Sequence, residues 1–275
     1  MIYVPVDIET AVRRECRRRR YSDRTVKTYI YCINRFLKFS GKTIDRISKK
    51  DVRLFLESLS ENEMAGNTMN VYHMSIRFLF EDILDKRIWI DIKYSKVPEK
   101  LPVVLSKEEV KKLFDVIKNT KHRLMVQLMY SAGLRVSELI NLRINDIELD
   151  KNYGWVRGGK GNKDRLFIVA DSLKDELRRF INSNEEWLFT SGRGGKYNMR
   201  SLQQIIKKAA KEASINSKIS PHTLRHSFAT HLIEDGYSVT EVQSLLGHKS
   251  PETTFTYLHT ASPSMIKIKS PIDNL

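Results

Sequence analysis

One change of hydrophobic period constrains the fold of this 275-residue sequence more than any other feature. Apolar residues recur every three or four positions over most of the chain, which predicts helices. The runs YGWVR (153–157) and RLFIV (165–169) break this period, and the glycine-rich loop GGKGNKD joins them. Short runs of β-branched and aromatic residues around such a loop predict an antiparallel hairpin. We therefore expect a mainly α protein with a small antiparallel β-sheet.

Capping residues mark the starts of the helices expected within residues 1–93. Ser22 opens a helix that Gly41 ends, Ser48 caps the next helix, and Asn67 begins a third. The apolar positions in these helices follow a spacing of three and four, so they share one buried face. Residues 1–93 are expected to form a compact helical domain.

A second domain is expected after an extended linker at residues 94–105, which holds two prolines and has no helical period. Ser106 then restarts helical structure with a capping box. The run HRLMVQLMYSAG is apolar nearly all round, which predicts the buried centre of this domain. Residues 106–260 would form a mixed α/β domain, and residues 261–275 a tail with two prolines.

The charge of the chain indicates a polyanionic partner. The net charge is +15 and the pI is about 9.7. Residues 1–93 carry 19 Lys and Arg against 13 Asp and Glu, a net +6, and the remainder carries 29 against 20, a net +9. Both parts are therefore basic, as a protein that grips DNA from two sides requires. The run RRECRRRR holds six arginines that repel one another, and contact with the phosphates of duplex DNA would relieve that repulsion. These residues are Arg13, Arg14, Arg17, Arg18, Arg19 and Arg20.

Hydrophobicity and cysteine usage favour a cytoplasmic protein without a membrane partner. No apolar run approaches the roughly 18–20 residues needed to span a bilayer. The first residues carry acids where an export signal would have a basic and then an apolar run, so no export is expected. Cys16 and Cys32 have no further Cys or His spacing around them, which indicates reduced thiols and neither a metal site nor a disulfide.

The stretch from 220 to 260 brings together residues suited to an anion. His222 and Arg225 are three apart at the start of a predicted helix, so they share a face near free backbone N–H groups. Gly247 ends the following helix and leaves His248 on the turn. Tyr257 lies nearly two turns into a last helix, which Ser250 and Pro251 would cap.

These residue types suit attack on a phosphodiester. Negative charge develops on the non-bridging oxygens, and arginine matches two of them with its planar fork. A tyrosine surrounded by cations has a lowered pKa and can act as the nucleophile. We therefore interpret Tyr257 as the nucleophile of the downstream half of such a site.

The spacing of HTLRH (222–226), LLGHKS (245–250) and Tyr257 resembles the signature of the tyrosine recombinases, the phage-integrase and Xer family. The first arginine box of that family is matched by SAGLRVSELINL (131–142), and its hairpin lysine by GGKGNKDR (158–165). The resemblance runs through the whole chain and is strongest to Xer-type chromosome resolvases. It implies a helical N-terminal core-binding domain that clamps DNA and a catalytic domain of the tyrosine recombinase type.

The resemblance also implies roles for individual residues. Arg135 and Arg225 would bind the non-bridging oxygens of the scissile phosphate, and Glu138 would orient the site. Lys160 would protonate the departing 5′ oxygen; Lys163 lies on the same loop, although the loop spacing favours Lys160.

The resemblance also implies roles in acid–base catalysis, phosphate binding and covalent catalysis for His222, His248 and Tyr257. His222 would act as general base or acid on the tyrosine, and His248 would hydrogen-bond a phosphate oxygen. Tyr257 would form a 3′-phosphotyrosyl link. Since that link keeps the phosphoester energy, neither ATP nor another cofactor is needed. His222 and His226 are four apart, but no Glu follows His222 and no third ligand is evident, so no metal is expected.

These residues together predict a DNA strand transferase that recombines specific sites. Family resemblance implies a homotetramer on two sites of double-stranded DNA, exchange through a Holliday junction, and resolution of chromosome dimers at a dif-like site. The tail at 261–275 would contact a neighbouring protomer, and an accessory recombinase or translocase is possible. Three alternatives stay open: a type IB topoisomerase, the integrase of a mobile element, and an inactive basic DNA-binding protein.

Overall fold

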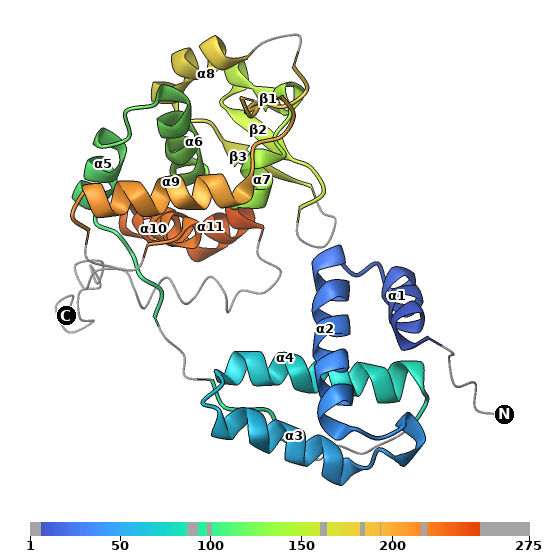
Figure 1. The fold of residues 1–275 in the computed structure, drawn as a ribbon. Coiled ribbons are helices and arrows are strands. Elements are labelled where there is room, and N and C mark those ends of the chain that lie inside the picture. Colours follow the sequence, from blue (N-terminus) through green and yellow to red (C-terminus); the bar gives the residue numbers. More distant parts are fainter. Residues whose placement is uncertain are drawn as a thin grey trace, which may run out of the picture. The chain divides into compact units, whose positions relative to one another are not determined.

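The computed structural model describes residues 7–86, 93–97, 101–159, 164–181, 185–192, 194–215 and 219–247. The chain divides into two compact units, Met1–Glu99 and Lys100–Leu275 (Figure 1). Both units are mainly helical, and the second also holds a small antiparallel sheet. The predicted fold class is confirmed. Among the described helices, none combines the length and apolar character needed to cross a bilayer.

The described residues of the first unit form four α-helices, with a π-helical turn after the last of them. Helix α2 packs against α1, α3 and α4, and its Phe36 contacts the rings of Phe55 and Phe80 in the core. Cys16 and Cys32 are both buried and both free thiols. The elements are α1 (Ile8–Arg18), α2 (Asp23–Ser40), the 3₁₀ turn η1 (Ile44–Arg46), α3 (Lys49–Glu61), α4 (Gly66–Arg77) and the π-turn η2 (Phe78–Ile83).

Two helix starts and one helix stop in this unit follow the sequence signals. Ser22 caps α2 through Thr25, and Ser48 pairs with Asp51 at the start of α3. Gly41 ends α2 in the left-handed conformation, with φ of 59°. The start of the next helix was predicted wrongly at Asn67: α4 begins at Gly66, because the Ala65 carbonyl accepts the first helical hydrogen bonds.

The second unit is organised around α6, which runs through its core as the apolar run predicted. Five of its side chains are fully buried: Leu124, Met125, Val126, Leu128 and Met129. The helices are α5 (Lys107–Asp115), α6 (Thr120–Ser131), α7 (Val136–Ile140), α8 (Lys174–Phe180), α9 (Met199–Glu212), α10 (Pro221–Glu234) and α11 (Val239–Leu246).

A three-stranded antiparallel sheet in the order β1-β2-β3 lies in this unit (Figure 1). The predicted hairpin corresponds to β2 (Tyr153–Val156) and β3 (Arg165–Ile168), in a register that pairs Val156 with Arg165. Gly154 is required there, since a Cβ on it would meet the Phe167 ring at 2.3 Å. The two-residue strand β1 (Ile147–Glu148) was not predicted, because two residues carry no readable alternation.

Helix α10 is hydrogen-bonded to the segment that precedes α5 and to α6. The Ser227 hydroxyl accepts a 2.9 Å hydrogen bond from the Leu105 amide, and Nδ1 of His231 lies 2.8 Å from the Tyr130 hydroxyl. Leu105, Ser227 and His231 are all buried. The helix that carries His222 and Arg225 is thus fixed on several sides.

Candidate active site

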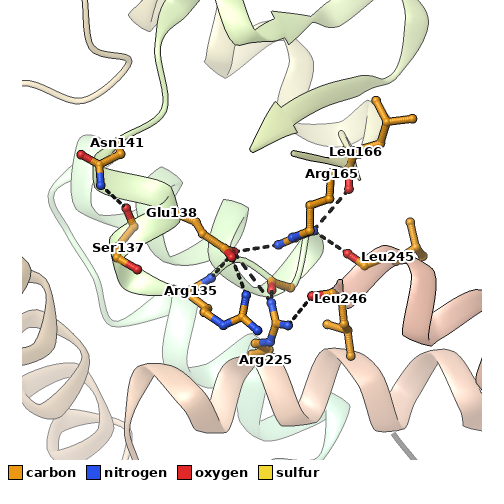
Figure 2. Close-up of polar contacts among 10 residues, drawn as sticks. Arg135, Ser137, Glu138, Asn141, Arg165, Leu166, Arg225, Leu245 and Leu246 are labelled. Atoms are coloured by element: carbon orange, nitrogen blue, oxygen red, sulfur yellow. Dashed lines mark hydrogen bonds and ion pairs between the residues drawn. The ribbon is translucent and has the colours of Figure 1, made fainter. Parts of the chain in front are cut away.

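Three arginines from distant parts of the chain surround the carboxylate of Glu138 (Figure 2). Arg135 precedes α7, Arg165 begins β3, and Arg225 lies one turn into α10. The structure thus brings together two predicted arginines and the predicted acid, and adds a third arginine. One negative and three positive groups leave this cluster with a net charge of +2.

Glu138 is the buried centre of the cluster. Its side chain is 5% exposed, and its Oε1 accepts a 2.6 Å hydrogen bond from Nη1 of Arg135. Its Oε2 accepts from the Arg135 backbone amide at 2.9 Å and from Nη2 of Arg165 at 2.7 Å. Burial raises the pKa of Glu138, but the charge of Arg165 and the bonds from both arginines outweigh burial and hold it below its ordinary value. Glu138 is therefore a carboxylate at neutral pH.

Arg135 is the more accessible of the two predicted arginines. Its side chain is 21% exposed, and Glu138 engages its Nη1. Guanidinium carries five N–H donors, so further donors remain for an anion that approaches from solvent.

Arg225 is 3% exposed and is held mainly by backbone carbonyls. Its Nη1 donates to the Gly133 carbonyl, and its Nη2 donates to the Leu246 carbonyl at 2.6 Å. Nη1 lies 3.8 Å from Oε2 of Glu138, beyond hydrogen-bond distance. Carbonyls at the C-terminal end of α11 carry partial negative charge, which favours a cation there. These carbonyls fix the position of the Arg225 guanidinium, and because they are neutral groups they do not cancel its positive charge.

His222 lies in the first turn of α10, as predicted; the residue is accessible to solvent, although neighbouring groups bury part of its imidazole. Partial burial, with Arg225 and Arg135 nearby, lowers the pKa of His222. His222 is thus a neutral imidazole at neutral pH and can accept a proton. His226 lies one turn later with its ring centroid 6.4 Å away, and burial together with His222 and Arg225 lowers its pKa to about 4.

Arg165 is the residue of this cluster that the sequence analysis missed. Its side chain is 9% exposed. Its Nη1 donates to the carbonyl of Leu245 in α11, and Nη2 donates to Glu138 (Figure 2). A signal existed, because Arg165 shares the inward face of β3 with the buried Phe167 two residues on. A charged residue at such a position requires a buried partner.

Four predicted site residues lie outside the described residues: Lys160, Lys163, His248 and Tyr257. One chain neighbour is described for each of Lys160, Lys163 and His248. Asp164 closes the base of the hairpin loop, where it accepts from the Gly158 amide and from Nη1 of Arg157, both at 2.9 Å. Gly247 ends α11 with φ of 63°, directly before His248. Lys160, Lys163 and His248 are therefore each directly bonded to a described residue, whereas Tyr257 lies ten residues beyond Gly247.

Helix α1 carries the first four of the six N-terminal arginines, and Arg19 and Arg20 follow its end. Arg13 pairs with Glu9, while Arg18 and Arg19 both pair with Glu15. Arg19 also pairs with Asp82 at 2.6 Å. These ion pairs relieve part of the repulsion from which a phosphate contact was inferred. Five of the six side chains are exposed, and Arg19 is intermediate.

The cluster can bind an anion and stabilise charge that develops on it. Fixed guanidinium groups in a partly dry site act on oxyanions more strongly than they would in water. In the described part of the chain, no three His, Cys, Asp or Glu side chains are arranged to hold a metal ion.

Comparisons with known proteins agree with the resemblance in sequence. Residues 103–263 match the phage integrase family, and residues 9–90 match the phage integrase N-terminal SAM-like domain. Tyrosine recombinase XerA of Thermococcus kodakarensis is 37% identical over 246 residues, which cover 86% of this chain and 84% of the relative.

Two solved structures share the fold. The crystal structure of XerA recombinase is 29% identical with a TM-score of 0.55, and the match covers 95% of this chain and 96% of the other. The XerH site-specific recombinase, bound to a palindromic difH substrate in a post-cleavage complex, is 22% identical with a TM-score of 0.74. That match covers 98% of this chain and 86% of the other.

Proposed function

Since this chain belongs to the phage integrase family and is a site-specific tyrosine recombinase, we propose that it cuts and rejoins duplex DNA through a 3′-phosphotyrosyl intermediate. The observation that supports this most is the arginine cluster. Arg135 and Arg225 are fixed beside a buried carboxylate, yet the cluster keeps a net positive charge. A phosphodiester carries one negative charge and gains a second as the pentacoordinate transition state forms, so the cluster complements the transition state.

In the cleavage step, Tyr257 attacks the scissile phosphorus through its phenolic oxygen. The bond to tyrosine forms as the bond to the 5′ oxygen breaks, and Lys160 donates a proton to that oxygen. Arg135 and Arg225 bind the non-bridging oxygens, and His248 donates a further hydrogen bond. His222 takes the phenolic proton, a role that its neutral form and exposed position allow.

In the rejoining step, the free 5′ hydroxyl of the partner strand attacks the phosphotyrosine. Lys160, which gave its proton to the 5′ oxygen in cleavage, takes the proton of the attacking hydroxyl. The new phosphodiester forms as the bond to Tyr257 breaks, and His222 returns the proton to the phenol. The phosphoester count does not change, so the exchange is near energetic balance.

We further propose the assembly that carries out this exchange. Residues 1–93 form the core-binding domain, residues 94–105 the linker and residues 106–260 the catalytic domain, and the two domains clamp the DNA. The exposed arginines of residues 13–20 contact phosphates. Four protomers would hold two sites and exchange strands in pairs through a Holliday junction, with the tail at 261–275 reaching a neighbour. The resemblance to Xer recombinases, among them a XerA relative 37% identical, is our reason for proposing a dif-like target and a role in resolving chromosome dimers.

A covalent-adduct assay tests the function. Duplexes that the protein selects from a randomised library are nicked near the bound site, so that the cleaved strand end is lost and rejoining fails. Wild-type protein should form a denaturation-resistant protein–DNA adduct, whereas Tyr257→Phe should form none. Wild-type protein without adduct would be an inactive DNA-binding protein.

A two-site plasmid separates the remaining alternatives. Site-specific recombination predicts deletion or inversion between two copies of the selected site. Relaxation of supercoils without exchange would instead indicate a type IB topoisomerase. Exchange between a site on a circular element and a different chromosomal site, but not between two identical sites, would indicate a mobile-element integrase.

A further inference from the structure

Arg165 occupies an unusual position for a cation that carries no assigned role. Its side chain is nine-tenths buried, and its guanidinium contacts both Glu138 and the carbonyl of Leu245. Its Nε is buried and finds no acceptor among the described residues. A buried charge is retained only where strong partners offset its loss of hydration. The contacts that Arg165 makes must therefore offset the free-energy cost of burying its charge.

The contact between Arg165 and Glu138 determines how much positive charge the cluster keeps. Glu138 lies 2.6 Å from Arg135, and Arg225 is 3.8 Å away. Without a further cation, the carboxylate would offset much of the charge of the arginine pair that faces the phosphate. Arg165 approaches Oε2 to 2.7 Å from the other side. It therefore supplies the counter-charge, and Glu138 can orient Arg135 while the pair keeps its charge for the substrate.

The second contact fixes the geometry. Arg165 reaches from β3 to Leu245, and Arg225 reaches from α10 to Leu246, so two guanidinium groups hold the last turn of α11. Gly247 packs against the Arg165 side chain so closely that a Cβ there would lie 2.8 Å from its Cδ. His248 follows at once. The end of α11, the base of the hairpin and the start of α7 are thus joined through one side chain.

We propose that Arg165 is a positioning residue of the recombinase, which neutralises Glu138 and fixes the end of α11 so that Arg135 and Arg225 can act on the phosphodiester. This inference rests on the proposed function. Arg165 acts through other residues and does not touch the DNA. Its removal should therefore slow adduct formation at saturating protein while leaving the affinity for DNA unchanged.

A double-mutant cycle with Glu138 tests the inference on the nicked duplexes. In Arg165→Met, the carboxylate loses its counter-charge, and the rate of adduct formation should fall about 10²-fold. Glu138→Gln removes the charge that Arg165 offsets. The loss in the double variant should therefore be smaller than the product of the two single losses by about tenfold or more.

Two further variants serve as a conservative replacement and as a control. Arg165→Lys retains the charge but not the fork that reaches two acceptors, so its rate should lie between those of wild type and Arg165→Met. Arg178→Met removes an exposed arginine with two carboxylate partners and should behave as wild type. Melting temperatures are measured for every variant, and rates are compared where all are folded. If Arg165→Met does not fold, Arg165→Lys and its cycle with Glu138→Gln carry the test.

Three results would overturn the inference: a wild-type rate in Arg165→Met, a lysine variant as slow as the methionine variant, or losses that simply multiply in the cycle. Each requires that wild-type protein forms the adduct. Absence of adduct from wild-type protein would instead contradict the proposed function itself, so the two failures are distinguishable.

Discussion

Nη2 of Arg225 donates a 2.6 Å hydrogen bond to the backbone carbonyl of Leu246, the last residue of α11. The arginine proposed to hold the scissile phosphate is thus also the residue that fixes the helix end before His248. Its other terminal nitrogen holds the Gly133 carbonyl, just before the chain reaches Arg135. Arg225 would thus both bind the phosphate and support the local fold, so its replacement should lower both stability and activity.

Replacing Arg225 with methionine should destabilise the second unit as well as abolish cleavage. Two buried carbonyls lose their donor and Glu138 loses a neighbouring cation, so the free energy of unfolding should fall by about 2–5 kcal/mol. Urea denaturation measures the change. Arg178→Met removes exposed ion pairs and should cost less than about 0.5 kcal/mol. Equal stabilities of the two variants would show that the Arg225 contacts do not support the fold.

Acid should destabilise the second unit through His226. The pKa of His226 is lowered to about 4 by burial and by neighbouring His222 and Arg225, against 6.5 for an unperturbed histidine. Between these values the unfolded chain binds more protons than the folded chain, so stability is complete above about pH 6.5 and declines as pH falls toward 4. The midpoint of urea denaturation should follow this window.

His226→Gln is the control for that pH dependence, since a neutral amide does not titrate. Its denaturation midpoint should vary less between pH 7 and pH 4 than that of the wild type. His222 and His231 also have lowered pKa values and contribute in the same direction, so a part of the slope should persist. An unchanged slope in His226→Gln would contradict the assignment.

Gly247→Ala should impair cleavage by disturbing Arg165. The left-handed conformation at φ of 63° costs a side chain about 1 kcal/mol, and the new Cβ would meet Cδ of Arg165 at 2.8 Å. Adduct formation should slow by about tenfold or more as the end of α11 shifts. Gly41→Ala is a matched control: it ends α2 at φ of 59° with open space around it, so it should leave the rate unchanged. Equal rates in the two variants would show that the Arg165 contact is dispensable.

The two hairpin lysines can be separated through the leaving group. A substrate with sulfur in place of the bridging 5′ oxygen releases a thiolate, which needs no proton. If Lys160 is the acid, Lys160→Ala should fail on the oxygen substrate and recover on the sulfur substrate, while Lys163→Ala should lose mainly DNA affinity. Recovery of Lys163→Ala alone would transfer the role to Lys163.

Local signals in the sequence predicted most of the helices and the hairpin, because their causes are local. Ser48 and Ser106 start helices as expected, in capping boxes with Asp51 and Glu109, and Ser238 starts α11 in the same way with Glu241. Gly41 and Gly247 end helices in the conformation that glycine favours. The π-turn after α4 has no such signal, since its apolar spacing continues that of the helix.

The site was predictable as a set of residues but not as a network of charges. Arg135, Glu138, His222 and Arg225 stand out through the resemblance, and the structure places the three charged groups together. Which cation offsets Glu138 depends on tertiary contacts: Arg165 and Glu138 are 27 residues apart, and the Leu245 carbonyl is 80 residues from Arg165. No spacing rule links such positions.

The most direct test of the account identifies the residue bonded to DNA. Wild-type protein trapped on the nicked duplex is digested with nuclease and trypsin, and the peptides are sequenced by mass spectrometry. Cleavage after Lys249 and Lys267 yields a peptide whose only tyrosine is Tyr257. The account predicts that the nucleotide is attached to Tyr257. A nucleotide on any other residue, or on another peptide, would contradict it.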